Sequence, residues 1–138
     1  MASLRARWTL TAAIGFGGAA ALISVVAGLL MGFPNPFSIA VVVSATLTGG
    51  VLWYALVEHH DAEPVSRGAA AGVLTGLLAH IPLWFLMMVQ EPQSSVNHPS
   101  TVVSLVTLSI LFGGWVTVPL AGTAGLMLGL VRRYDTGQ

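Results

Sequence analysis

One histidine, His80, lies deep inside a long apolar stretch of the sequence, where an imidazole could do chemistry. It could relay a proton, contact a ligand or hold a haem iron. Bis-histidine haem would need a second histidine at the same depth, but His59 and His60 lie at a boundary and His98 lies outside. One chain therefore cannot supply the pair, although two copies of His80 in a parallel dimer, or a partner subunit, could supply it. We expect no cofactor. The structural alternative is a neutral imidazole that bonds a threonine hydroxyl.

Several hydroxyl side chains are expected at a depth similar to that of His80. Counted from the ends of the apolar stretches, they are Thr46, Thr48 and Thr117, with Ser44 one turn away from Thr48. Such a polar band could line a pathway or contact a ligand. Thr46, Thr48, His80 and Thr117 are therefore the candidate pathway or ligand residues.

Glu58, His59, His60, Asp61 and Glu63 form a second group of titratable side chains. Imidazoles combined with carboxylates can bind zinc or nickel. No second cluster completes a tetrahedral site, so we predict a solvated, charged loop and no metal. The sequence also contains neither a nucleophile elbow nor a zinc-protease motif. We therefore expect no catalytic residues and no enzyme activity.

Long apolar stretches must position these residues. The chain of 138 residues is 55% hydrophobic and 7% charged, whereas a soluble domain carries about 25% charged residues. Stretches of about 20 apolar residues cross a hydrocarbon core of about 30 Å as helices. We therefore predict an all-α integral membrane protein, a four-transmembrane-helix antiparallel bundle that forms a single membrane domain over residues 1–138. The predicted spans are about 8–33, 37–57, 67–90 and 106–131.

Composition excludes several classes of protein. Cysteine and lysine are absent, which removes thiol chemistry and a retinal-type Schiff base. The net charge of zero gives no case for nucleic acid as a partner. Small multidrug carriers have a similar size and helix count but depend on an acidic residue in the first span, which this chain lacks. The bulk of alanine, glycine and valine is typical of small membrane proteins of prokaryotes with GC-rich genomes.

The arginines predict the orientation. They lie before the first span, between the second and third spans, and after the fourth: Arg5, Arg7, Arg67, Arg132 and Arg133. The positive-inside rule therefore places both termini in the cytoplasm. We expect a multi-pass protein of the cell membrane with the lipid bilayer as its surroundings.

Small residues recur every fourth position in three of the spans. The lines are Gly68, Gly72 and Gly76 in the third span, Gly113, Thr117, Ala121, Gly125 and Gly129 in the fourth, and Ala20, Ser24, Gly28 and Gly32 in the first. Small residues let membrane helices approach closely. We expect the third and fourth spans to cross along their lines. The line in the first span faces another span or a second subunit.

Aromatic residues and a proline complete the sequence pattern. Rings near span ends favour the headgroup layer, so we expect membrane anchors at Trp8, Trp53, Tyr54, Trp84 and Tyr134.

Pro119 lies inside the fourth span and leaves the carbonyl of Trp115 without its usual donor. A kink is therefore expected there.

Two functions of different classes follow. The first is a structural or accessory subunit, homo-oligomeric or part of a larger membrane complex, which acts through the small-residue packing faces. The second is a small channel or carrier with the polar band around His80. Binding of a lipid or a pigment remains open beside them.

Overall fold

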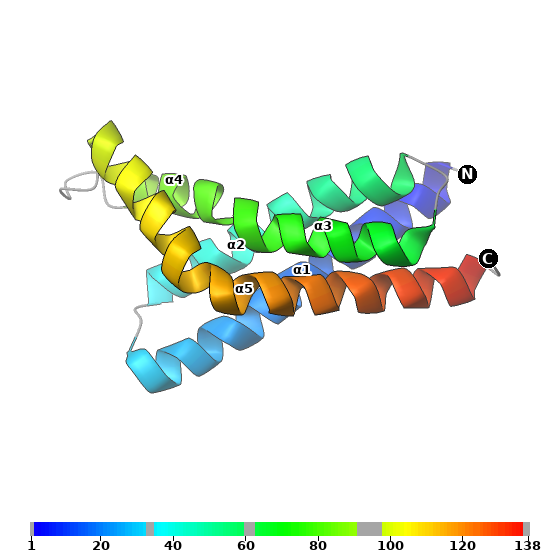
Figure 1. The fold of residues 1–138 in the computed structure, drawn as a ribbon, viewed down its shortest axis with the longest axis horizontal. Coiled ribbons are helices and arrows are strands. Elements are labelled where there is room, and N and C mark those ends of the chain that lie inside the picture. Colours follow the sequence, from blue (N-terminus) through cyan, green and yellow to red (C-terminus); the bar gives the residue numbers. More distant parts are fainter. Residues whose placement is uncertain (1, 33–34, 60–62, 91–97, 137–138) are drawn as a thin grey trace.

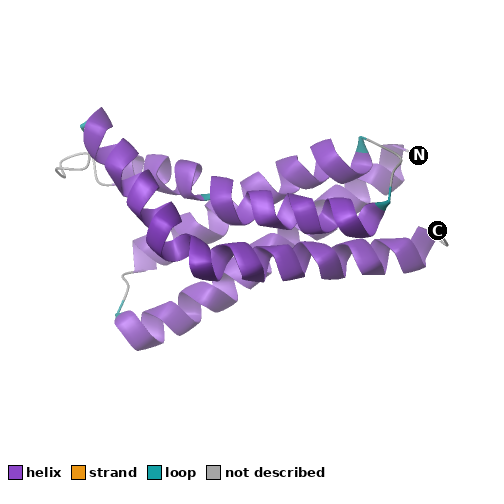
Figure 2. Ribbon diagram, in the orientation of Figure 1, coloured by secondary structure: helices purple, strands orange, loops and turns teal. Residues whose placement is uncertain are grey.

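The protein folds almost entirely into helices (Figures 1 and 2). The computed structural model describes residues 2–32, 35–59, 63–90 and 98–136. The elements are α1 (Ala2–Met31), α2 (Asn35–Trp53), the π-helix η1 (Tyr54–Glu58), α3 (Pro64–Leu78), α4 (His80–Gln90) and α5 (Pro99–Thr136). Four helical stretches are long and apolar enough to cross a membrane: Leu4–Leu30, Phe37–Glu58, Pro64–Gln90 and Pro99–Asp135. These stretches confirm the predicted four apolar, membrane-length helices.

The two ends of the molecule differ in character. Both termini lie at one end of the bundle (Figure 1), where Arg7, Arg67 and Arg132 each make polar contacts with another helix or its end. We call this the arginine end. At the opposite, distal end, the last part of α1 and the first part of α5 diverge from the bundle axis (Figure 1).

The third membrane span is two helices rather than one. Helix α3 ends at Leu78, and α4 begins at His80. Pro82 has no N–H, so the carbonyl of Leu78 loses its usual helical donor. The hydroxyl of Ser44 in α2 donates to the carbonyl of Ala79, the residue at the break. The prediction of one continuous span missed this break, although Pro82 was the sequence signal for it.

Helix α5 is a single element of 38 residues with Pro119 inside it. At about 1.5 Å per residue it is about 57 Å long, well beyond the hydrocarbon thickness. Figure 1 shows α5 bending between its yellow N-terminal part and its orange middle part. Pro119 removes a hydrogen-bond donor from this helix, which weakens the turn before it.

Helices α3 and α5 pack backbone against backbone. A Cβ atom on Gly68 would lie 2.5 Å from the carbonyl oxygen of Gly125, and one on Gly76 would lie 2.7 Å from that of Thr117. A Cβ on Gly72 would overlap the carbonyl of Ala121. Only glycine permits this approach, because any side chain would push the two backbones apart. The structure therefore brings two of the expected lines together inside one chain.

A buried cluster fills the half of the bundle near the arginine end. Its members come from α1, α2, η1 and α3: Ala12, Phe16, Trp53, Val57 and Ala71. Phe16 of α1 packs directly over Gly49 of α2, and Thr46 of α2 packs over Gly17 of α1. These contacts make the α1–α2 pair close-packed in this half.

Two of the expected aromatic anchors are core residues instead. Trp53 is 0% exposed and Trp8 is buried, so both rings pack against protein instead of presenting a surface to lipid. The physical reason is that four helices meeting at one end leave space for large rings between them. Tyr54 and Tyr134 are exposed, as anchors would be, and Trp84 is half-buried.

The small-residue line of α1 is only partly buried. Ala20 and Ser24 are buried, but Cβ atoms on Gly28 and Gly32 would meet no described atom within 4 Å. Gly32 has φ +70°, and its N–H donates to the carbonyl of Gly28 at 3.0 Å. It therefore ends the helix as a C-terminal cap. Among the described residues, the expected packing at Gly28 and Gly32 is not found, because α1 diverges from the bundle axis there (Figure 1).

Candidate functional site

A cavity of about 460 Å³ lies between the helices, toward the distal end. All four membrane-length stretches contribute to its walls. Its lining extends from Phe16, in the buried cluster, to Phe37 and Trp84 near the distal end. The volume falls in the range of roughly 300–1,000 Å³ that small-molecule sites occupy. We call it the distal cavity.

His80 lines the distal cavity and is itself buried. Its Nε2 atom lies 3.2 Å from the Oγ1 atom of Thr117. That hydroxyl also lies 3.0 Å from the carbonyl oxygen of Gly76 and 3.2 Å from that of Gly113. A hydroxyl has one proton, so when it donates to a carbonyl, the neutral imidazole donates its Nε2–H to the hydroxyl. His80 is thereby held across the α4–α5 contact.

The rest of the polar band is not assembled around His80. The Thr46 hydroxyl donates to the carbonyl of Val42 in its own helix at 2.7 Å. Neither Thr46 nor Thr48 lines the distal cavity, whereas Ser44 does. Thr46 comes two residues after Ser44, about 200° around the helix, and so faces α1. Thr48 shares the face of Ser44 but lies one turn nearer the arginine end.

The side chains that line the distal cavity are mostly apolar. Its lining contains small side chains, such as Ala19 and Ala45, and large rings, such as Trp84. Among these lining residues there is no aspartate, glutamate or arginine, and His80 is the single titratable one. The cavity therefore offers shape and apolar contact, with hydroxyl groups and one imidazole as its polar features.

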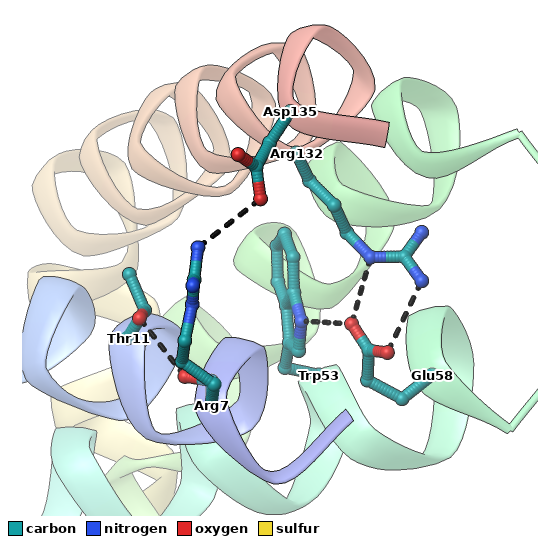
Figure 3. A network of polar contacts seen from close by, with 6 residues as sticks. All are labelled: Arg7, Thr11, Trp53, Glu58, Arg132 and Asp135. Carbon is teal, nitrogen blue, oxygen red and sulfur yellow. Dashed lines mark hydrogen bonds and ion pairs between the residues drawn. The ribbon is translucent and has the colours of Figure 1, made fainter. Parts of the chain in front are cut away.

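A second buried polar group lies at the arginine end (Figure 3). Glu58 is 1% exposed. Its Oε1 lies 2.8 Å from Nε of Arg132, and its Oε2 accepts from Nη2 of the same arginine at 3.1 Å. The Trp53 indole also donates to Oε1 at 3.1 Å. The ion pair joins the end of η1 to α5.

The expectation of a solvated loop is wrong for Glu58. Glu58 comes five positions after Trp53, which in an α-helix places the two side chains about 140° apart. The π-helical turn closes over five residues, marked by the His59 N–H donating to the Tyr54 carbonyl at 2.9 Å, and brings both side chains to one side. Nothing in an α-helical reading of the sequence signals this contact.

The remaining loop residues stay at the surface where they are described. His59 and Glu63 are exposed, while His60 and Asp61 lie outside the described residues. Within the described part of the chain, no group of three histidine or acidic residues could hold a metal ion. An exposed ion pair of 3.2 Å between Arg7 and Asp135 joins α1 to α5 nearby (Figure 3).

Comparison with known proteins adds no assignment to this geometry. No protein-family model, curated protein or solved structure matches the chain. The function must therefore be inferred from the distal cavity, the arginine end and the helix faces themselves.

Proposed function

We propose that this protein binds an apolar, membrane-soluble molecule and holds it in the distal cavity beside His80. The observation that supports the proposal is the cavity of about 460 Å³, lined by helices long and apolar enough to cross a membrane. The residues that line it include no aspartate, glutamate or arginine, and His80 is the single titratable residue among them. An apolar molecule would give up no hydrogen bonds with water by leaving the lipid for such a site, and close contact with the rings would offset its lost freedom of motion.

A binding protein or carrier fits this site better than an open channel. Toward the arginine end the cavity meets the buried cluster, including Phe16 and Trp53. Beside that cluster, the backbones of α3 and α5 touch at Gly72 and Ala121. A water-filled path would have to cross both layers of close packing.

Native mass spectrometry of the protein gently extracted from its own membrane tests the proposal. The wild type is expected to carry an apolar molecule. Ala45→Phe fills the distal cavity, because Ala45 lines it, and is expected to lose the bound mass. Ala70→Phe is the matched control, because Ala70 is exposed on α3, and should keep it. A wild type without any bound molecule contradicts the proposal.

A second candidate function is a structural or accessory subunit, as a homo-oligomer or part of a larger membrane complex. It is supported by a groove of about 490 Å³ between α1 and α2, lined by Ala21, Gly28 and Val42 among others. A Cβ atom on Gly28 would meet no described atom of another helix within 4 Å, and small residues allow a further helix to approach. Gly28→Leu is then expected to dissociate the complex in the same mass measurement. Unchanged assembly contradicts this function.

A further inference from the structure

Contacts between neighbouring helices close two sides of the distal cavity, the side between α2 and α4 and the side between α4 and α5. Between α2 and α4, the rings of Phe37 and Trp84 lie 6.4 Å apart, and Ser44 donates to the carbonyl of Ala79. Between α1 and α2, Phe16 packs over Gly49 at the end of the cavity nearer the arginine end. The side between α2 and α4 is therefore held by direct side-chain contact.

The side between α4 and α5 is also closed. The Trp84 indole donates to the hydroxyl of Ser109 at 3.0 Å, and His80 lies 3.2 Å from Thr117 one to two turns further along. Helix α4 and the N-terminal part of α5 thus form a connected wall of the cavity.

The side between α1 and α5 differs. The contacts that join these helices lie nearer the arginine end: a Cβ on Gly15 would touch the Leu128 side chain at 3.1 Å, and Arg7 pairs with Asp135. At the level of the cavity, no hydrogen bond, ion pair or ring contact found among the described residues joins α1 to α5. Figure 1 shows the two helices diverging in this half.

The residues on this side show that the cavity reaches the surface there. Ala27 of α1 and Phe112 and Val116 of α5 all line the cavity. Phe112 is nevertheless 79% exposed, and Val116 is exposed as well. A side chain that both lines a cavity and is exposed stands at its rim. Because the rim residues are apolar and belong to membrane-length helices, the opening faces hydrocarbon rather than water.

We infer that the distal cavity opens sideways into the bilayer between α1 and α5 and takes one hydrocarbon chain of a membrane lipid. The inference rests on the proposed function and names its ligand. One water molecule occupies about 30 Å³ in the liquid, so a volume of about 460 Å³ corresponds to on the order of 15 water molecules. A methylene group has a similar size, so the cavity has room for one long alkyl chain, whose headgroup and second chain would remain in the bilayer.

Tryptophan quenching by lipids with brominated acyl chains tests the inference, because bromine quenches a ring only at close range. Trp84 lines the cavity, whereas Trp8 and Trp53 are buried at the other end. Trp115 is 84% exposed and would be quenched from outside, so it is first replaced by phenylalanine. In vesicles of brominated phosphatidylcholine, W115F is expected to lose fluorescence strongly relative to unbrominated vesicles. The further change W84F should abolish most of that loss.

A pair of matched variants distinguishes a chain inside the cavity from lipid on the outer surface. In the W115F protein, Ala27→Phe narrows the rim, and the quenching of Trp84 should fall several-fold. Leu29→Phe is the control on the same helix, because Leu29 is exposed and does not line the cavity; it should leave the quenching unchanged. Equal quenching in the two variants, or none in W115F, overturns the inference.

The two proposals fail in different ways. A bound mass in native spectra without quenching of Trp84 means that the cavity holds another apolar molecule, so the proposed function stands and the lipid-chain inference falls. In the converse case, Trp84 is quenched and Ala27→Phe reduces that quenching, but native spectra show no bound mass. This outcome supports the lipid-chain inference and contradicts a ligand that stays bound during extraction.

Discussion

At the scale of single residues, the ion pair of Glu58 and Arg132 is expected to contribute more to the stability of the arginine end than the ion pair of Arg7 and Asp135 does. Both groups are largely buried, with side-chain exposures of 1% and 12%. Removing one partner from a buried pair strands the other charge, at a cost of about 3–5 kcal/mol. The pair between Arg7 and Asp135 is exposed, and such pairs contribute about 0–1 kcal/mol.

We therefore expect Glu58→Ala to lower the melting temperature of the detergent-solubilised protein strongly, and Asp135→Ala to leave it nearly unchanged. The double change Glu58→Leu with Arg132→Met should recover much of the loss, because it removes both buried charges. Circular dichroism during heating measures all of these variants. Equal effects of Glu58→Ala and Asp135→Ala would show that Glu58 is solvated after all.

The contact of His80 with Thr117 gives a second prediction at this scale. Thr117→Val keeps the shape of the side chain but leaves the buried imidazole nitrogen without its partner, which costs about 1–3 kcal/mol. Thr117→Ser retains the hydroxyl and should cost less. The comparison uses the same heating experiment, and a Thr117→Val protein as stable as Thr117→Ser speaks against the hydrogen bond.

At the scale of elements, the contact of α3 with α5 depends on the absence of side chains. Gly72→Ala would place a Cβ against the Ala121 carbonyl, and backbone atoms cannot move aside as a flexible side chain can. We expect a loss of about 1–3 kcal/mol, as for other overpacked sites. Gly18→Ala on α1 is the control, because a Cβ there would meet nothing within 4 Å; it should be neutral or stabilising by up to about 1 kcal/mol. A neutral Gly72→Ala would contradict the close crossing.

At the scale of the whole molecule, the distribution of arginine predicts that the arginine end faces the cytoplasm. Because the chain has no cysteine, single cysteines report the side of the membrane cleanly. Ser100, at the start of α5, and Ser66, in the first turn of α3, are both exposed. In intact cells a membrane-impermeant thiol reagent should label Ser100→Cys, and should label Ser66→Cys only after permeabilisation. The reverse pattern would invert the orientation.

The sequence by itself determined the features that depend on local pattern. Apolar run length predicted the four membrane-length helices, because a helix needs a fixed number of residues to cross hydrocarbon. The glycine line from Gly68 to Gly76 predicted a close-packing face, because residues four apart lie on one side of a helix. Pro119 predicted a kink for the equally local reason that it lacks a donor.

Only the tertiary structure decided which of these faces meet and where space remains between them. The burial of Glu58 depends on a π-helical turn and on an arginine 74 positions away, and neither follows from α-helical periodicity. Thr46 faces α1 rather than His80, because the rotation of α2 about its axis is set by its contacts with Phe16 and Gly17. The distal cavity exists because α1 and α5 diverge. Such a divergence is a relation between helices, which no single stretch of sequence contains.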